Sequence, residues 1–210
     1  MSVGRIIETE ADVAEGAAAL AAMDPRFAYA LQLTGPLPLR RREGGFQALL
    51  SAIVSQQISV AAANGIWSRL EAQGATSADG FARLDEAGHK ACGLSRQKAR
   101  YATALVDAGV PFQDLPHMPD AEVVERLTCI TGIGVWTAEI YAMFSLGRAD
   151  VFAPGDLALQ EAARMLFDLP ERPKERPFRQ MAEDWAPWRA VAARLLWAYY
   201  HVVKDREGIR

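Results

Sequence analysis

The stretch that decides the fold of this chain is Leu127–Leu159, LTCITGIGVWTAEIYAMFSLGRADVFAPGDLAL. Apolar residues recur at helical spacing on both sides of Gly132-Ile133-Gly134, which predicts two helices joined by a tight hairpin. Glycines let a ligand approach the backbone, and the first amides of the second helix favour an anion such as phosphate. Asp156 lies where a third helix is expected to begin. The stretch thus combines a phosphate grip with an acid at a helix N-terminus.

Each half of this pattern also has a purely structural explanation. A Gly-x-Gly turn is common between ordinary packed helices, and an aspartate at a helix start is commonly an N-cap. Asp156 can serve both as a cap and as a catalytic group, because a helix N-terminus stabilises the ionised carboxylate. No Gly-Lys-Ser/Thr follows the hairpin, so a nucleotide-binding P-loop is excluded.

Helical periodicity extends over most of the 210 residues, and no segment shows sustained strand-type alternation. We therefore expect an all-α protein with two helical lobes and an active-site cleft between them. Residues 46–159 form the lobe with the hairpin, and residues 1–45 and 160–210 form the other. The helices are expected at about 11–23, from 26, 46–70 with a break at 55–57, near 81–87, 95–108, from a cap at Asp120 to 130, 135–146, 156–167, and after a linker at 170–177.

Composition narrows the classes of function. No apolar run is long enough to cross a bilayer, and the N-terminus lacks the apolar core of a secretory signal, so a cytoplasmic location is expected. Two cysteines and three scattered histidines provide neither an iron–sulfur ligand set nor a transition-metal site. The net charge of −3 lacks the basic excess of most nucleic-acid binders, but binding through backbone amides needs few cations.

The motifs together resemble the helix-hairpin-helix DNA glycosylases, in which a glycine- and proline-rich loop ends in an aspartate. The hairpin and Asp150–Asp156 carry the most specific part of the similarity. Ser55–Val60, Gly93–Ser95 with Lys98, and Trp185–Arg189 extend it over about residues 46–200. Within the family the chain looks most similar to the DNA-3-methyladenine glycosylase II group, in a short form without an N-terminal β domain.

The resemblance implies that the protein flips alkylated purines out of double-stranded DNA and hydrolyses their N-glycosidic bonds in base excision repair. Asp156 would be the catalytic carboxylate. Relatives that also nick DNA carry a lysine in the hairpin, where this chain has Trp136, so lyase activity is not expected. Trp136 and Trp188 would wall the base pocket, where an indole can stack on a cationic base.

Further residues are implied to contact DNA. Gln57 has the position of the wedge that fills the gap left by the flipped nucleotide. The implied DNA-contacting set is Gln56, Gln57, Gly132, Ile133, Gly134, Thr137 and Lys98. The backbone carbonyls of Thr128, Ile130 and Ile133 resemble a structural site for sodium or potassium. No other cofactor, no obligate protein partner and no membrane are expected.

Several alternatives stay open at this point. Gln56 and Gln57 also fit a solvated patch between two helical runs, Lys98 also fits a solvated helix lysine, and Trp188 also fits the core. At the level of function, the chain could be a non-catalytic helix-hairpin-helix module that only binds DNA. It could also be a glycosylase for deaminated or oxidised bases.

Overall fold

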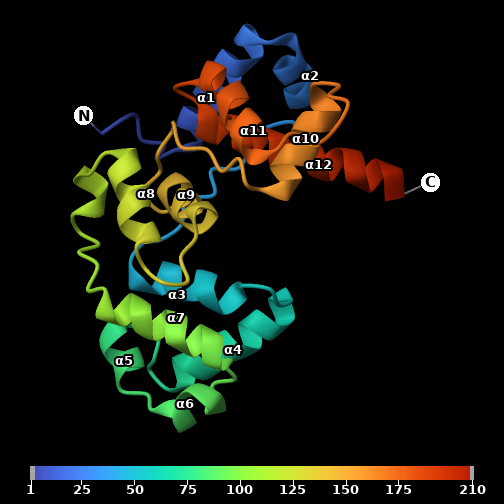
Figure 1. Cartoon of the computed structure of the whole chain (residues 1–210). Coiled ribbons are helices and arrows are strands. Elements are labelled where there is room, and N and C mark those ends of the chain that lie inside the picture. The colour runs from blue at the N-terminus through green and yellow to red at the C-terminus, as the bar shows by residue number, and fades with distance from the viewer. Residues whose placement is uncertain (1–2, 209–210) are drawn as a thin grey trace. The chain divides into compact units, whose positions relative to one another are not determined.

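The computed structural model describes residues 3–208, and they are almost entirely helices, loops and turns (Figure 1). Within this range no strand forms, and the one β-type contact is an isolated antiparallel bridge between Ile6 and Arg148. The all-α expectation is confirmed. Over the same residues, no helix combines the length and the apolar character that spanning a bilayer requires.

The first of two compact units contains Arg42–Tyr141. Helix α7 packs against α3 and α5, and the apolar stripe of α3 is buried, with Leu50 and Ile53 fully inaccessible to solvent. The elements of this unit are α3 (Phe46–Ser55), α4 (Val60–Ala72), α5 (Ala78–Ala82), α6 (Glu86–Ala91), α7 (Arg96–Asp107), the 3-10 turn η1 (Leu115–His117), α8 (Asp120–Thr128) and the beginning of α9 (Val135–Phe144).

Serine caps fix where two of these helices begin. The side chain of Ser59 accepts the N–H of Ala62 at the start of α4, and that of Ser95 accepts the N–H of Lys98 at the start of α7. The expected cap at Asp120 is wrong: Pro119 occupies the N-cap position and Asp120 is the first helical residue. An acid still suits this first turn because of the helix dipole.

The second unit contains Gly4–Arg41 and the chain from Ala142 onward. Its long helix α12 packs against α1, α2 and α10 and is the centre of the unit. The elements are α1 (Glu10–Met23), α2 (Pro25–Thr34), α10 (Leu157–Leu166), α11 (Glu175–Met181), the 3-10 turn η2 (Ala182–Trp185) and α12 (Arg189–Gly208).

Part of the linker expected at residues 170–177 is helical, because α11 begins at Glu175. Pro177 lies in the first turn of α11, where the missing N–H costs no intrahelical bond. Phe178, directly after it, is fully buried and meets the rings of Phe152 and Trp185 edge to face. The charged residues and prolines of residues 170–177 are typical of a linker, so the sequence pattern did not predict this short helix.

The chain enters the second unit at Ala142, whereas the sequence pattern placed the boundary after residue 159. Hydrogen bonds of the N-terminal segment explain the difference. The N–H of Ile7 donates to the carbonyl of Gly147 at 2.7 Å, and the N–H of Ala149 donates to that of Arg5 at 3.0 Å. The loop after α9 therefore belongs with the N-terminal residues.

Candidate active site and DNA-contacting hairpin

Asp156 is the N-cap of α10 in the second unit. Its Oδ1 accepts the backbone N–H groups of Ala158 and Leu159 at 2.9 and 3.0 Å. The side chain is partly exposed, and the next residue, Leu157, is 63% exposed. The N–H groups and the helix dipole both favour a negative charge at this position. The carboxylate is thus held in one orientation at the protein surface.

Trp197 of α12 is a third donor to the same oxygen, with its Nε1 3.2 Å from Oδ1 of Asp156. The indole is buried, and its ring lies 5.8 Å from that of Phe144. Packing therefore fixes the position of the Trp197 indole, and its N–H helps to orient the carboxylate of Asp156. No sequence motif pointed to Trp197.

The loop of residues 148–155, called here the Asp loop, is anchored along its length. Arg189 makes a bidentate ion pair with Asp150 at 2.7 and 2.8 Å. The buried Nε2 of Gln160 donates to the carbonyl of Pro154 at 2.7 Å. Two parallel bonds between a guanidinium and a carboxylate define distance as well as orientation. The loop therefore delivers Asp156 to the start of α10 with little freedom.

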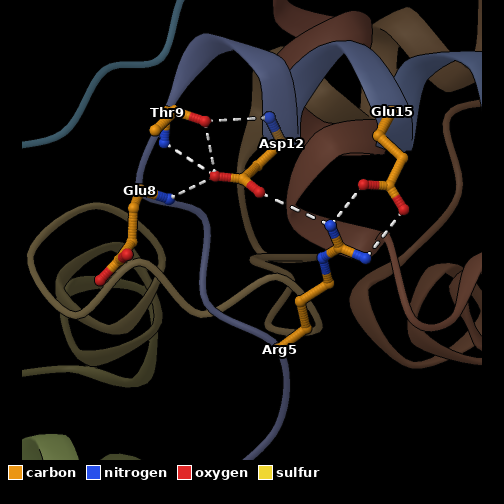
Figure 2. Close-up of polar contacts among 5 residues, drawn as sticks. All are labelled: Arg5, Glu8, Thr9, Asp12 and Glu15. Carbon is orange, nitrogen blue, oxygen red and sulfur yellow. Dashed lines mark hydrogen bonds and ion pairs between the residues drawn. The ribbon is translucent and has the colours of Figure 1, made fainter.

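The N-terminal segment, residues 4–9, holds the other side of this loop. Arg5 bonds to Asp12 and Glu15 of α1, and Asp12 also accepts bonds from Glu8 and Thr9 (Figure 2). These bonds, chiefly the one from the Thr9 hydroxyl, lower the pKa of Asp12 to about 2. The segment is thus tied to α1 by side chains and to the Asp loop by its backbone.

Trp188 lies in the interior of the second unit. It is 6% exposed, and the guanidinium of Arg5 lies 4.4 Å from the centre of its ring. A methyl group at Gly16 would come within 2.5 Å of the ring, so α1 packs directly against the indole. These contacts suit a core residue; the pocket role implied by the resemblance stays a prediction.

Arg40 lies near the ring of Trp197, and Arg41 and Arg194 lie near Phe144. Arg194 is fully buried, donates to the carbonyls of Leu39 and Ala190, and lies 4.8 Å from the ring of Phe144. Burial and the charges of Arg40 and Arg41 lower the pKa of Arg194 to about 10. Arg194 therefore stays protonated at neutral pH.

The hairpin, residues 129–134, connects α8 to α9 in the first unit. Ile130 and Ile133 are buried, and the N–H of Ile133 donates to the carbonyl of Ile130 at 3.0 Å. The first bond within α9 is donated by Ala138 to Gly134, so the amides of the first turn, including that of Thr137, have no carbonyl partner inside the helix. The hairpin therefore presents the expected type of anion-binding backbone, although the Ile133 amide is engaged internally.

Trp136 occupies the first turn of α9 and is 46% exposed, beside Val135 at 45%. Large apolar side chains on a surface often mark a binding site. No lysine is present in the hairpin or in α9, because the four lysines of the chain lie elsewhere. The exposed indole fits the implied contact with a base, which stays a prediction.

The turn between α3 and α4, residues 56–59, is called here the wedge turn. Gln57 adopts a left-handed φ of 56°, which is unusual for glutamine, and its side chain is exposed. Gln56 points back into the unit, where its Nε2 donates to the carbonyl of Gly132 at 2.9 Å. The expected break in the helix at these residues is confirmed, and Gln56 contacts the hairpin itself.

Lys98 is half-buried on α7, and its Nζ lies 2.5 Å from the carbonyl oxygen of Val54 in α3. Burial lowers its pKa. One turn further along α7, the ring of Tyr101 rests against Gly132, where an added Cβ would come within 2.3 Å of its Cγ. Gly132 has a φ of 99°, so both backbone conformation and space require glycine there.

An open cavity of about 570 Å³ lies among the wedge turn, the start of α7 and the hairpin. Most of the DNA-contacting residues expected from the sequence line it. The lining residues are Gln56, Gln57, Ile58, Ile66, Gly93, Ser95, Gln97, Lys98, Tyr101, Gly132, Ile133 and Gly134. The first unit therefore brings together side chains and amides from three segments that are distant in sequence.

Known proteins are similar to this chain over the segments that carry these features. The profile of the HhH-GPD superfamily base excision DNA repair proteins matches residues 50–187. DNA-3-methyladenine glycosylase 1 of Schizosaccharomyces pombe is 30% identical over 190 residues, which cover 85% of this chain and 83% of that protein.

Solved structures of similar proteins have the same fold. The DNA-3-methyladenine glycosidase of Bacillus halodurans superimposes with a TM-score of 0.82 at 30% identity, covering 98% of this chain and 94% of the other. The 3-methyladenine DNA glycosylase of Schizosaccharomyces pombe in complex with abasic DNA has a TM-score of 0.74 at 28% identity and covers 87% and 95%. The similarity thus extends over nearly the whole chain.

Proposed function

Because the chain belongs to the HhH-GPD superfamily of base excision DNA repair proteins, we propose that it is a monofunctional DNA glycosylase for alkylated purines. It flips the damaged base, 3-methyladenine foremost, out of double-stranded DNA and hydrolyses the bond between the base and C1′. The names of the similar proteins support this substrate class.

The orientation of Asp156 is the observation that carries the proposal. Two backbone amides and the Trp197 indole fix one carboxylate oxygen at a helix N-terminus. A fixed negative charge stabilises the positive charge that develops on the deoxyribose as the bond to the base breaks. The same carboxylate can orient a water molecule and accept its proton while the water attacks C1′.

The chemistry of the leaving group explains why few further catalytic side chains are needed. Alkylation makes the purine cationic, so it departs with the electron pair of the broken bond as a neutral base. An exposed indole such as Trp136 favours a cationic ring over a neutral one. With no lysine in the hairpin, the chain offers no amine there for a Schiff base, which supports hydrolysis without strand cleavage.

The hairpin and the wedge turn hold the substrate in this proposal. The first-turn amides of α9 bind a phosphate, and Gln57 enters the space left by the flipped nucleotide. The carbonyls of Thr128, Ile130 and Ile133 are oxygen donors of the kind that hold sodium or potassium. The tight turn closed by the Ile133-to-Ile130 bond suits such a structural ion. Since the substrate is chromosomal DNA, we place the protein in the compartment that contains it, the cytoplasm in a bacterium.

Replacing Asp156 by asparagine tests the proposal. Asparagine caps helices about as well as aspartate, so the thermal midpoint should stay within about 2 °C. The rate of 3-methyladenine release from methylated duplex DNA, measured under single-turnover conditions, should fall by about 10³-fold because the negative charge is lost. DNA binding should persist.

Two outcomes would contradict this function. An Asp156→Asn variant that keeps most of its activity would remove the carboxylate from the mechanism. A wild-type protein that binds DNA but releases no base would instead be a non-catalytic DNA-binding module. Parallel substrates containing hypoxanthine or 8-oxoguanine distinguish alkylation repair from the repair of deaminated or oxidised bases.

A further inference from the structure

The ammonium of Lys98 meets the C-terminal end of a helix. The last four carbonyls of a helix have no partner within it, and the carbonyl of Val54 belongs to this last turn of α3. Val54 is 1% exposed, so water has little access to it. Lys98, at 2.5 Å, supplies both a hydrogen bond and a positive charge where the helix dipole is negative.

The same helix that carries Lys98 also touches the hairpin. Tyr101 lies three residues after Lys98 on α7, on the same face, and its ring covers Gly132. Gln56 joins the wedge turn to the carbonyl of Gly132 at 2.9 Å. Within the first unit, α7 therefore contacts both the end of α3 and the hairpin, and the wedge turn after α3 contacts the hairpin as well.

We propose that Lys98 is a positioning residue for the wedge turn and does not bind a DNA phosphate. Through Val54 it fixes the end of α3, and Gln56 then fixes the turn against the hairpin, so that Gln57 keeps a constant place relative to the hairpin amides. This inference rests on the proposed function, because the role of Gln57 as a wedge does.

Two observations, one on the turn and one on Lys98, favour this role. The left-handed φ of 56° at Gln57 is unfavourable for a residue with a side chain and persists only where neighbouring contacts enforce it. Lys98 is also partly removed from solvent, as its lowered pKa reflects, whereas a lysine that meets phosphate needs an accessible ammonium.

The salt dependence of DNA binding separates the two roles. We would measure the affinity of wild type, Lys98→Met and Lys90→Met for undamaged duplex DNA over a range of salt concentrations. Lys90 is an exposed lysine on α6 and serves as the charge-matched control. A lost phosphate contact reduces the slope of log K against log salt by about 0.9. We expect the Lys98→Met slope to equal that of the wild type.

A second measurement follows the turn directly. Hydrogen exchange of the Gln57 and Ile58 amides should become faster in Lys98→Met, while Lys98→Arg, which keeps the donor, should restore the wild-type rate. Base release at saturating enzyme should fall by about tenfold, because the wedge is displaced after DNA has bound. Gln56→Ala should act in the same direction, and the double variant should lose less than the two single losses combined.

The proposal is overturned if the slope falls by about 0.9 in Lys98→Met, or if exchange in the wedge turn is unchanged. Thermal melting confirms that each variant is folded, and Gln56→Ala carries the exchange test should Lys98→Met not fold. If the wild type releases no alkylated base, the proposed function fails, but the salt slope and the exchange rates still decide the role of Lys98.

Discussion

The wedge turn contains Gln57 and the Asp loop leads directly to Asp156, the two side chains with proposed roles, but the two segments are held in opposite ways. In the wedge turn Gln57, Ile58 and Ser59 are exposed, and Val60 directly after them is 77% exposed. In the Asp loop, Val151–Pro154 are buried, and side chains and backbone anchor both ends.

The difference fits the roles that we propose for the two segments. A turn that enters DNA has to stay in solvent until the DNA arrives, so only bonds at its base, such as Gln56 to Gly132, can hold it. A carboxylate that stabilises a developing charge must not reorient during the reaction, so burial of its loop is an advantage. Variants at the support of each segment should therefore have different signatures.

Among variants at these supports, the largest effect is expected for Gly132→Ala, which disturbs the support of the wedge turn. Alanine would place a Cβ 2.3 Å from Tyr101 and would adopt a φ of 99°. We expect a loss of about 3 kcal/mol in the free energy of unfolding and about 100-fold slower base release. Chemical denaturation measures the free energy of unfolding, and single-turnover kinetics measure the rate of base release.

Gly134→Ala is the matched control, because its Cβ would meet no atom within 4 Å and its φ is not positive. The stability should stay within about 0.5 kcal/mol of the wild type. The affinity for DNA should fall by about tenfold, because the methyl group occupies space that a phosphate needs. Equal stability losses in the two variants would contradict the geometry of the hairpin.

A smaller effect is expected for Trp197→Phe, which removes the indole N–H from Asp156 but keeps an aromatic ring. Base release should slow by about tenfold with little change in DNA affinity, because the carboxylate loses one of its orienting donors. Single-turnover rates and binding isotherms measure these quantities separately.

Trp188→Phe completes this experiment. If Trp188 only packs against Gly16 and Arg5, the variant should lose stability without a specific loss of base release. A loss of substrate binding with unchanged stability would instead support the pocket role that the resemblance implies. A normal rate for Trp197→Phe would show that the backbone amides alone orient Asp156.

The smallest effect concerns the N-terminal segment and its dependence on pH. The pKa of Asp12 is about 2 in the folded protein, below its ordinary 3.8. A lowered pKa stabilises the fold above the ordinary value, and this contribution disappears as the pH falls from about 4 to about 2. The thermal midpoint of Asp12→Asn should therefore lie below that of the wild type at neutral pH and approach it near pH 2.

Glu10→Gln changes the same charge in the same turn of α1 and serves as the control for Asp12→Asn. Glu10 is exposed, so at neutral pH the thermal midpoint of Glu10→Gln should lie closer to that of the wild type than the midpoint of Asp12→Asn does. A constant difference for Asp12→Asn, down to pH 2, would contradict the assigned cause.

Local patterns were enough to predict most of the helices, the hairpin and the helix start at Asp156, but not α11. Glycine conformation, serine caps and apolar periodicity act within a few residues, so Ser95 and the break at Ser55–Gln57 could be read from the sequence. Asp120 shows the limit of this approach, because Pro119 took the position of the cap.

The supports of the site could not be predicted, because they join residues distant in sequence. Trp188 directly precedes α12 and Trp197 lies within it, and both are buried. Only the packing of α12 shows which of them meets Asp156. In the same way, nothing near Lys98 in the sequence indicates that its partner is the carbonyl of Val54.

The pairing of Arg5 and Ile7 with Ala149 and Gly147 also bears on how the protein is made. On the ribosome the N-terminal residues emerge first, but their partners follow only after all of Arg42–Tyr141 has been synthesised. Residues Arg42–Tyr141, which make up nearly all of the first unit, are one continuous piece of chain, so they can fold while translation continues. Arg5 and Ile7 gain these partners only once Gly147 and Ala149 have been made, so we expect the second unit to complete its fold after the first.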